Sequence, residues 1–155
     1  MSFVVTGLPV EPFRPLFGLD AAALAARGAV RMTADSKPGF PCRITLEDAE
    51  PGETVLLLNH EHLAVDTPYR SRHAIFVRES ATAPARVDGV VPPVMATRLL
   101  SLRAFDAADM MIDAEVVEGA GAAPLIERFL DNPATAYLHA HAARRGCFVA
   151  RIDRA

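Results

Sequence analysis

The chain has 155 residues, which is long enough to bury a hydrophobic core, and its 51% apolar and 23% charged residues exclude a disordered chain. Its net charge of −3, with no run of basic residues, argues against binding to nucleic acid. No apolar stretch reaches the roughly 20 residues that span a bilayer, so no membrane partner is expected. We therefore expect a single domain over residues 1–155.

The first residues predict a β-strand and a location. The segment MSFVVTGLPVEPF lacks the basic start, the long apolar run and the small-residue cleavage site of a secretory signal, so we expect a cytoplasmic protein. Its short apolar run indicates a strand. In a reducing compartment Cys42 and Cys147 are expected as free thiols, and they form no Cys-x-x-Cys motif.

Two short helices are predicted. The first lies within residues 19–28, where Asp20 suits the N-cap and Gly28 suits the left-handed position that ends a helix. The second covers residues 124–131, which begin with a proline, place four apolar side chains on one face and end shortly before Pro133.

Most of the remaining sequence predicts β-strands. Strands are expected at residues 54–62, 74–78, 98–105 and 110–117, and two more flank the turn Arg144-Arg145-Gly146. The alternating patterns of residues 98–105 and 110–117 indicate a hairpin in which Arg103 faces Asp113 and Glu115. The proline-rich residues 84–93 are expected to form an irregular loop. The fold class is therefore α+β, with a mainly antiparallel sheet, flat or curled, and two short helices.

Turn chemistry predicts the register of the last hairpin. A three-residue loop that ends in glycine is a favoured hairpin connection, because Gly146 accepts the positive φ of its bulge. This loop pairs Ala142 with Phe148 and creates an apolar face. The opposite face then carries His139, His141, Cys147, Val149 and Arg151.

Four of the five histidines form two His-x-His pairs, and alternate residues of a strand point to the same side. The candidate metal ligands are His60, His62, His139 and His141. If their strands were neighbours, four ring nitrogens could surround a divalent transition metal such as zinc. Histidines on a half-exposed strand also serve as surface or packing residues, so the metal is a hypothesis.

A second candidate site is catalytic. On the predicted register Cys147 is a diagonal neighbour of His141, at roughly 7–8 Å between the backbones. A thiolate–imidazolium pair there would make Cys147 a nucleophile. The alternative is a cysteine that packs as a small apolar residue under the turn.

A third candidate site binds an anionic small molecule through the rigid fork of arginine, which suits carboxylate and phosphate groups. Its candidate residues are Tyr69, Arg70, Arg72, Arg78 and Arg151. Lys37 is the only lysine of the chain, so arginine is its general basic residue. A single arginine is therefore a weaker sign of anion binding here than in most proteins.

Four segments of the sequence resemble a bacterial family. They are PGFPCR (38–43), DAEPGETVLLL (48–58), PYRSRHAIFVRE (68–79) and AYLHAHAARRGCFVARIDR (136–154). The family is catalogued as domain of unknown function 1203, so the resemblance implies a single-domain bacterial protein and supplies no activity. The positions that the resemblance singles out are Cys42, Arg43, His62, Pro68, Tyr69, Arg70, His139, His141, Gly146 and Cys147.

Two functional hypotheses follow. The first is a domain that binds a small ligand or a metal, with or without catalysis, at a site where the C-terminal hairpin meets residues 62–70. Strand ends and loops of this kind are where sites usually form. The second is a protein-interaction or homodimerisation module without a metal, in which the histidine face is a contact surface.

Overall fold

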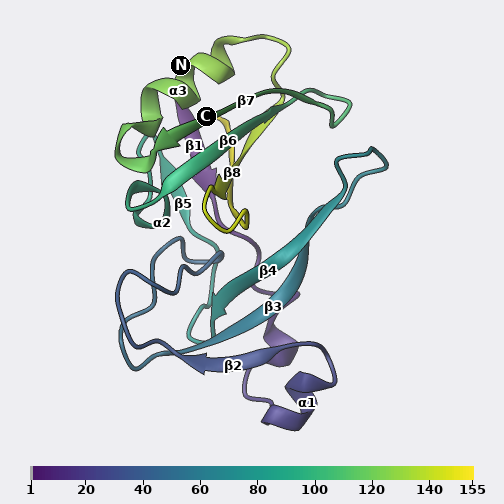
Figure 1. Cartoon of the computed structure of the whole chain (residues 1–155), viewed down its shortest axis with the longest axis vertical. Coiled ribbons are helices and arrows are strands. Elements are labelled where there is room, and N and C mark those ends of the chain that lie inside the picture. Colours follow the sequence, from purple (N-terminus) through teal and green to yellow (C-terminus); the bar gives the residue numbers. More distant parts are fainter. Residues whose placement is uncertain (1) are drawn as a thin grey trace.

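The computed structural model describes residues 2–155, which form two β-sheets with helices at their outer sides (Figure 1). The larger sheet contains the strands β1 (Phe3–Thr6), β5 (Arg86–Asp88), β6 (Leu99–Phe105), β7 (Met111–Glu118), β8 (Tyr137–Ala142) and β9 (Phe148–Arg154). The smaller sheet contains β2 (Val30–Thr33), β3 (Thr54–Leu63) and β4 (Ser71–Arg78). The helices are α1 (Ala21–Ala25), α2 (Pro93–Ala96) and α3 (Ala122–Asp131), with 3-10 turns at Arg14–Leu16 and Gly119–Gly121.

Both sheets are antiparallel. Within residues 2–155 the strand order is β5-β1-β9-β8-β6-β7 in the larger sheet and β2-β3-β4 in the smaller one. This confirms the predicted α+β class. The expected single sheet is in fact two open sheets, neither of them strongly curled. No helix of the described chain is long and apolar enough to cross a membrane.

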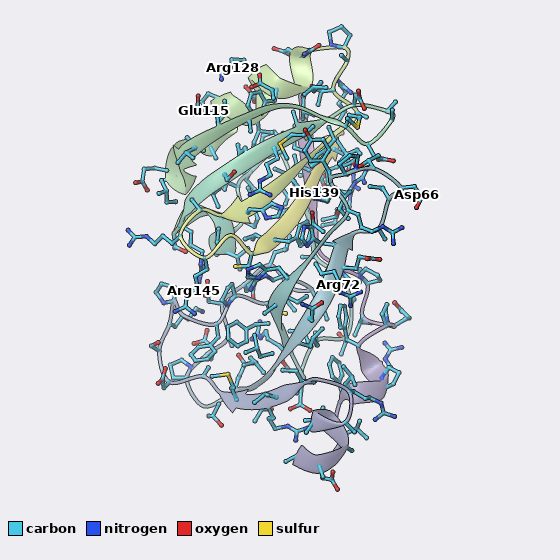
Figure 2. All side chains as sticks on the ribbon, turned by 45° about the vertical axis from the view of Figure 1, so that its right-hand side comes forward. Asp66, Arg72, Glu115, Arg128, His139 and Arg145 are labelled. Carbon is cyan, nitrogen blue, oxygen red and sulfur yellow. The ribbon has the colours of Figure 1, made fainter. Side chains whose placement is uncertain are left out.

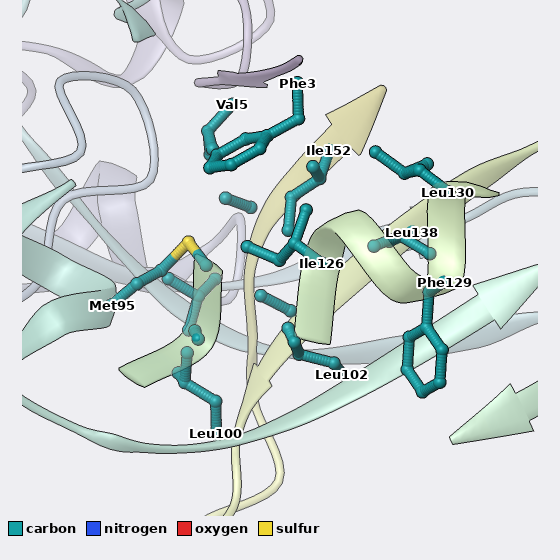
Figure 3. Packing of buried hydrophobic residues seen from close by; sticks show 14 of the residues in the cluster. Phe3, Val5, Met95, Leu100, Leu102, Ile126, Phe129, Leu130, Leu138 and Ile152 are labelled. Carbon is teal, nitrogen blue, oxygen red and sulfur yellow. The ribbon is translucent and has the colours of Figure 1, made fainter. Parts of the chain in front are cut away.

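The main hydrophobic core lies between α3 and the larger sheet (Figure 3). Ile126 and Leu130 of α3 are fully buried in one cluster with Leu102, Leu138 and Ile152 of the sheet. Their spacing of four residues places both on one face of the helix, and each buried side chain of this size contributes about 1.5–3 kcal/mol. The helix therefore covers one face of the sheet and leaves the other face toward the smaller sheet.

The local signals for turns and caps are confirmed. The carboxylate of Asp20 accepts a hydrogen bond from the backbone N–H of Ala23 at 2.8 Å, as an N-cap does. Gly28 and Gly146 have φ angles of 71° and 81°, in the region that favours glycine. The predicted irregular loop at residues 84–93 is wrong in part, because β5 forms there by pairing with β1.

The last hairpin keeps the predicted register away from its turn and changes it near the turn. Ala140 pairs with Ala150, as predicted. Next, however, His141 pairs with Phe148, because a bulge inserts Val149 as an extra residue of β9. The predicted register is therefore wrong at this point. Phe148 lies on the histidine face of the sheet, and Val149 lies in the core.

The backbone packs closely around Gly119, so a substitution at this position tests the packing. A Cβ at this position would lie 1.7 Å from the carbonyl oxygen of Met95, which no side-chain movement can relieve. We expect Gly119→Ala to lower the free energy of unfolding by about 3 kcal/mol in urea denaturation. Gly121→Ala is the matched control, since no described atom lies within 4 Å of its Cβ position. Equal losses in both variants would contradict the packing.

Candidate functional site

Three histidines meet where the two sheets approach each other. The ring centroid of His62 on β3 lies 5.0 Å from that of His141 and 6.2 Å from that of His139, both on β8. Phe148 stacks on His62 with its centroid at 5.2 Å and the planes 8° apart. Figure 2 shows His139 near the middle of the molecule. The structure thus brings the C-terminal hairpin next to His62.

His60 does not belong to this three-histidine cluster. Its ring packs against Phe13 with a centroid distance of 5.6 Å. A bulge between His60 and Leu63 interrupts the alternation of β3, so that His62 faces the larger sheet. Among residues 2–155, no group of three or more His, Cys, Asp or Glu side chains is placed to hold a metal ion. The arrangement therefore gives no support to a four-histidine zinc site.

Burial keeps the clustered imidazoles neutral. Desolvation lowers the pKa of His139 and of His141 to about 3, and that of His62 to about 4. Nδ1 of His141 lies 2.9 Å from the carbonyl oxygen of Gly146, and because a carbonyl can only accept, this nitrogen carries the proton. Nδ1 of His62 and Nδ1 of His139 are buried without a hydrogen-bond partner in the described chain.

Arg103 lies near this cluster. The sequence placed it opposite Asp113 and Glu115, but it pairs with Ala114 and so lies on the other face of the hairpin. Its Nε is 3.3 Å from the hydroxyl of Ser101, and burial lowers the pKa of its guanidinium. The predicted contact with the two carboxylates is therefore absent from the described structure.

Two of the predicted anion-binding arginines are occupied by acids of this chain. Arg78 donates to both carboxylate oxygens of Glu53, at 3.0 Å and 2.6 Å. Arg151 binds Asp153 at 2.8 Å and lies over the ring of Tyr137 at 4.1 Å from its centroid. Both side chains are thus held by structural partners.

The other three predicted anion-binding residues lie around the connection between β3 and β4. Arg70 pairs with Asp66 at 3.0 Å, and Arg72 donates to the side-chain oxygen of Asn59 at 2.6 Å. Tyr69 packs near Phe105. Figure 2 shows Asp66 and Arg72 on one side of the molecule and Arg145 on the other. Arg70 and Arg72 both approach Glu61 at 3.8 Å, whereas Arg78 pairs with Glu53 at the other end of β4, so the five predicted residues do not all meet in one place.

A pocket of about 740 Å³ lies between the two sheets at the turn of the C-terminal hairpin, within the size range of ligand sites. Its apolar lining comes mainly from the smaller sheet and the segment before β3: Met32, Phe40, Leu57 and Phe76. Its basic lining consists of Arg43, Arg98, Arg144, Arg145 and His73. Glu118 is the one acidic residue of the lining among residues 2–155.

Arg43 is the buried cation of this pocket, with 2% of its surface exposed. Its Nε donates to the carbonyl of Phe148 at 2.8 Å, its Nη1 to the carbonyl of Pro41 at 2.6 Å and its Nη2 to Sγ of Cys147 at 3.0 Å. Burial lowers the pKa of the guanidinium, and the nearby Cys147 offsets only part of this shift. Among the described residues no carboxylate forms an ion pair with Arg43.

The other arginines of the pocket differ in how they are held. Arg98 donates to both oxygens of the buried Asp48, at 2.6 Å and 3.0 Å. Burial opposes the ionisation of Asp48, but these bonds outweigh it and leave its pKa below the ordinary value. Arg144 and Arg145 are exposed and take part in none of the ion pairs within residues 2–155. They are therefore the cations that a ligand can reach.

Cys147 has a different neighbour from the one predicted. The hydrogen-bond partner of its Sγ is Arg43, whereas His141 bonds to the backbone next to it. The resemblance had singled out Arg43 without a role. No local pattern shows this role, because the two residues are 104 positions apart. Whether Cys147 and His141 take part in catalysis stays a prediction.

The chain belongs to the family described as protein of unknown function (DUF1203), which matches residues 39–154. This range contains Arg43, Cys147 and the three-histidine cluster, and it begins after β2. No curated protein and no solved structure matches the chain. The family confirms the resemblance seen in the sequence and adds no activity.

The buried histidines predict how stability depends on pH. An unfolded histidine has a pKa of about 6.5, whereas the folded values for His139 and His141 are about 3. Between these values the unfolded chain binds more protons, so the free energy of unfolding falls as the pH falls below 6.5. We expect a loss of about 2 kcal/mol per histidine between pH 7 and pH 5, measured by urea denaturation.

The control for this pH effect compares the slopes of two variants. His139→Leu should flatten the dependence between pH 7 and pH 5, whatever its absolute stability. Leu130→Ala should keep the wild-type slope although it lowers stability, because it opens the core under α3 and removes no histidine. If the slope in His139→Leu were as steep as in the wild type, burial of His139 would not be a source of the pH dependence.

Proposed function

We propose that this member of the family binds a small organic anion in the pocket between its two sheets. The observation that carries the proposal is the lining of the pocket, which supplies four arginines against one glutamate. A concave, partly apolar site with a few convergent polar groups is the usual form of a small-molecule site. The proposal keeps the C-terminal hairpin as part of the site and replaces residues 62–70 by Arg43 and the middle of β4.

The two kinds of lining define the chemistry of the ligand. The rings of Phe40 and Phe76 lie 5.2 Å apart and form an apolar wall, which suits a hydrocarbon body. The guanidinium groups at the hairpin turn suit a carboxylate, since their fork matches its two oxygens. Because Arg98 is already paired with Asp48, the ligand charge is assigned to Arg144 and Arg145. An aromatic or aliphatic carboxylate fits both walls.

Thermal shift measurements test this proposal with benzoate and hexanoate as probes, and with benzamide and hexanol as neutral counterparts. If the carboxylates bind with a Kd near 1 mM, 10 mM ligand stabilises the folded chain by about 1.4 kcal/mol, which raises Tm by a few degrees. We expect this shift for the carboxylates and a clearly smaller one for the neutral probes.

Paired arginine variants locate the binding site. The double change Arg144→Ala and Arg145→Ala should weaken carboxylate binding about tenfold, the loss of roughly 1.4 kcal/mol. Arg128→Ala on α3 is the matched control, because Arg128 lies far from Arg145 in Figure 2. Shifts that survive the double change, or neutral probes that act as strongly as the carboxylates, would refute an anion site in this pocket.

A second candidate function, homodimerisation, is supported by β7. This strand is the last in the order of the larger sheet, so one of its edges is unpaired within the described chain. Ile112 and Val116 on it are 40% and 54% exposed. An unpaired edge strand is a template for pairing with another strand, and exposed apolar side chains favour such pairing. If β7 paired antiparallel with the β7 strand of a second copy of this chain, Ile112 and Val116 of each copy would be partly covered by the other copy.

Sedimentation equilibrium tests the β7 dimer. We expect a dimer at about 100 μM wild-type protein and a monomer for Val116→Lys, because the apolar Val116 side chain would be covered in the dimer and a lysine there would lose its hydration. Glu115→Lys serves as the control, since this neighbour points to the opposite face of the strand. A wild-type monomer at this concentration would exclude the dimer.

A further inference from the structure

We propose that the ligand of the pocket is an α-amino acid with a large apolar side chain, and that Glu118 selects it by binding its ammonium group. This rests on the proposed function, because the pocket and the carboxylate site at Arg144 and Arg145 are the same. It adds a positive charge to the ligand and assigns a residue to that charge.

Glu118 is an acid in a pocket whose other charged side chains are arginines. It is exposed, and it takes part in none of the ion pairs within residues 2–155. It precedes the 3-10 turn Gly119–Gly121 but forms no side-chain hydrogen bond that caps it. Asp48, in contrast, is held by Arg98 at 2.6 Å. The carboxylate of Glu118 is therefore open to a ligand.

The register of the larger sheet places Glu118 near the arginines of the hairpin turn. Glu118 of β7 pairs with Leu99 of β6, and the carbonyl of Leu99 accepts a hydrogen bond from the N–H of Ala143 at 2.9 Å. Ala143 directly precedes Arg144. Two strand spacings, roughly 10 Å in total, therefore separate the backbone of Glu118 from the start of the turn. Long side chains from these two places can contact the same small molecule.

The charge of Glu118 disfavours a simple carboxylate, because like charges repel each other. A ligand that also carries an ammonium group turns this repulsion into attraction. Such a group offers three hydrogen-bond donors, and its bonds to a carboxylate are of the strong, charge-assisted kind. An α-amino acid carries both charged groups on one carbon atom. Its carboxylate then binds at Arg144 and Arg145 while its ammonium group binds Glu118.

The apolar wall of the pocket sets the requirement for the side chain of the ligand. Leu57 and Phe76 are opposite each other on β3 and β4, so they share one face of the smaller sheet. The ring of Phe40 packs on that of Phe76, and Met32 extends the wall with 36% of its surface exposed. Covering this surface with hydrocarbon is favourable. A phenylalanine, leucine or methionine side chain can do so.

Chemical-shift titration of the intact, ¹⁵N-labelled chain at pH 7 tests the inference with four probes that share a phenyl group. L-Phenylalanine carries both charges, 3-phenylpropanoate and N-acetyl-L-phenylalanine carry the carboxylate alone, and 2-phenylethylamine carries the ammonium group alone. We expect L-phenylalanine to bind about fivefold more tightly than either carboxylate, as one solvent-exposed ion pair allows. The amine alone should not bind, because the arginines repel a lone cation.

The carboxylate probes separate the two levels of the assignment. If 3-phenylpropanoate or N-acetyl-L-phenylalanine binds as tightly as L-phenylalanine, the pocket is an anion site that does not recognise an ammonium group. The amino-acid assignment is then wrong, and the proposed function stands. If neither of these carboxylates nor L-phenylalanine binds, both are wrong.

A pair of glutamate variants tests the role of Glu118. Glu118→Gln should weaken binding of L-phenylalanine about fivefold without weakening that of 3-phenylpropanoate, and it should fold because the side chain is exposed. Glu115→Gln is the matched control on the same strand, since Glu115 does not line the pocket and lies away from Arg145 in Figure 2. It should change both affinities less than about twofold. Equal losses in the two variants would indicate an effect of net charge and overturn the assignment.

Discussion

The placement of the two sheets depends on one buried guanidinium. The backbone N–H of Arg43 donates to Phe76 of β4, and its side chain donates to Phe148 of β9, so one residue joins both sheets. Its backbone carbonyl also accepts from Leu8, which follows β1. An interior charge of this kind tolerates few alternative arrangements, because each unmet hydrogen bond to it costs about 1.5–3 kcal/mol. Arg43 therefore ties together the strands on both sides of the pocket that it lines.

Phe148 connects the two chemical environments of the molecule. Its carbonyl binds Arg43, while its ring packs on His62 and His139. The backbone of Phe148 therefore contacts a guanidinium that is positively charged, whereas its ring contacts imidazoles that stay neutral. The bulge at Val149 makes this possible, since it moves Phe148 onto the histidine face without exposing the apolar core.

The sequence predicted those features that depend on neighbouring residues. The cap at Asp20 and the turn at Gly146 follow from local chemistry, and both are present. The bulges in β3 and β9 could not be predicted, because alternation alone assumes that no extra residue is inserted. The strand β5 was hidden for a related reason. Its pairing with β1 is a tertiary contact that overrides a proline-rich neighbourhood.

The candidate site was predicted in part. The hairpin and His62 do come together, but Arg78, which looked available, is held by Glu53, 25 positions away, and no local pattern shows this partner. The resemblance singled out Arg43, but its role could not be derived, because that role comes from burial and from a sulfur 104 residues away. Because this chain has one lysine, the presence of an arginine is weak evidence for anion binding, and the contacts of each arginine decide its role.

The pocket places its charges in two dielectric environments, and this has a consequence for how salt acts on it. Arg144 and Arg145 face solvent, where dissolved ions screen a charge beyond a Debye length of about 8 Å at physiological ionic strength. Arg43 is shielded from those ions by the protein around it. Ionic strength therefore acts on the approach of a charged molecule to the mouth of the pocket. The electrostatic effect of the buried Arg43 on the Cys147 sulfur is nearly independent of ionic strength.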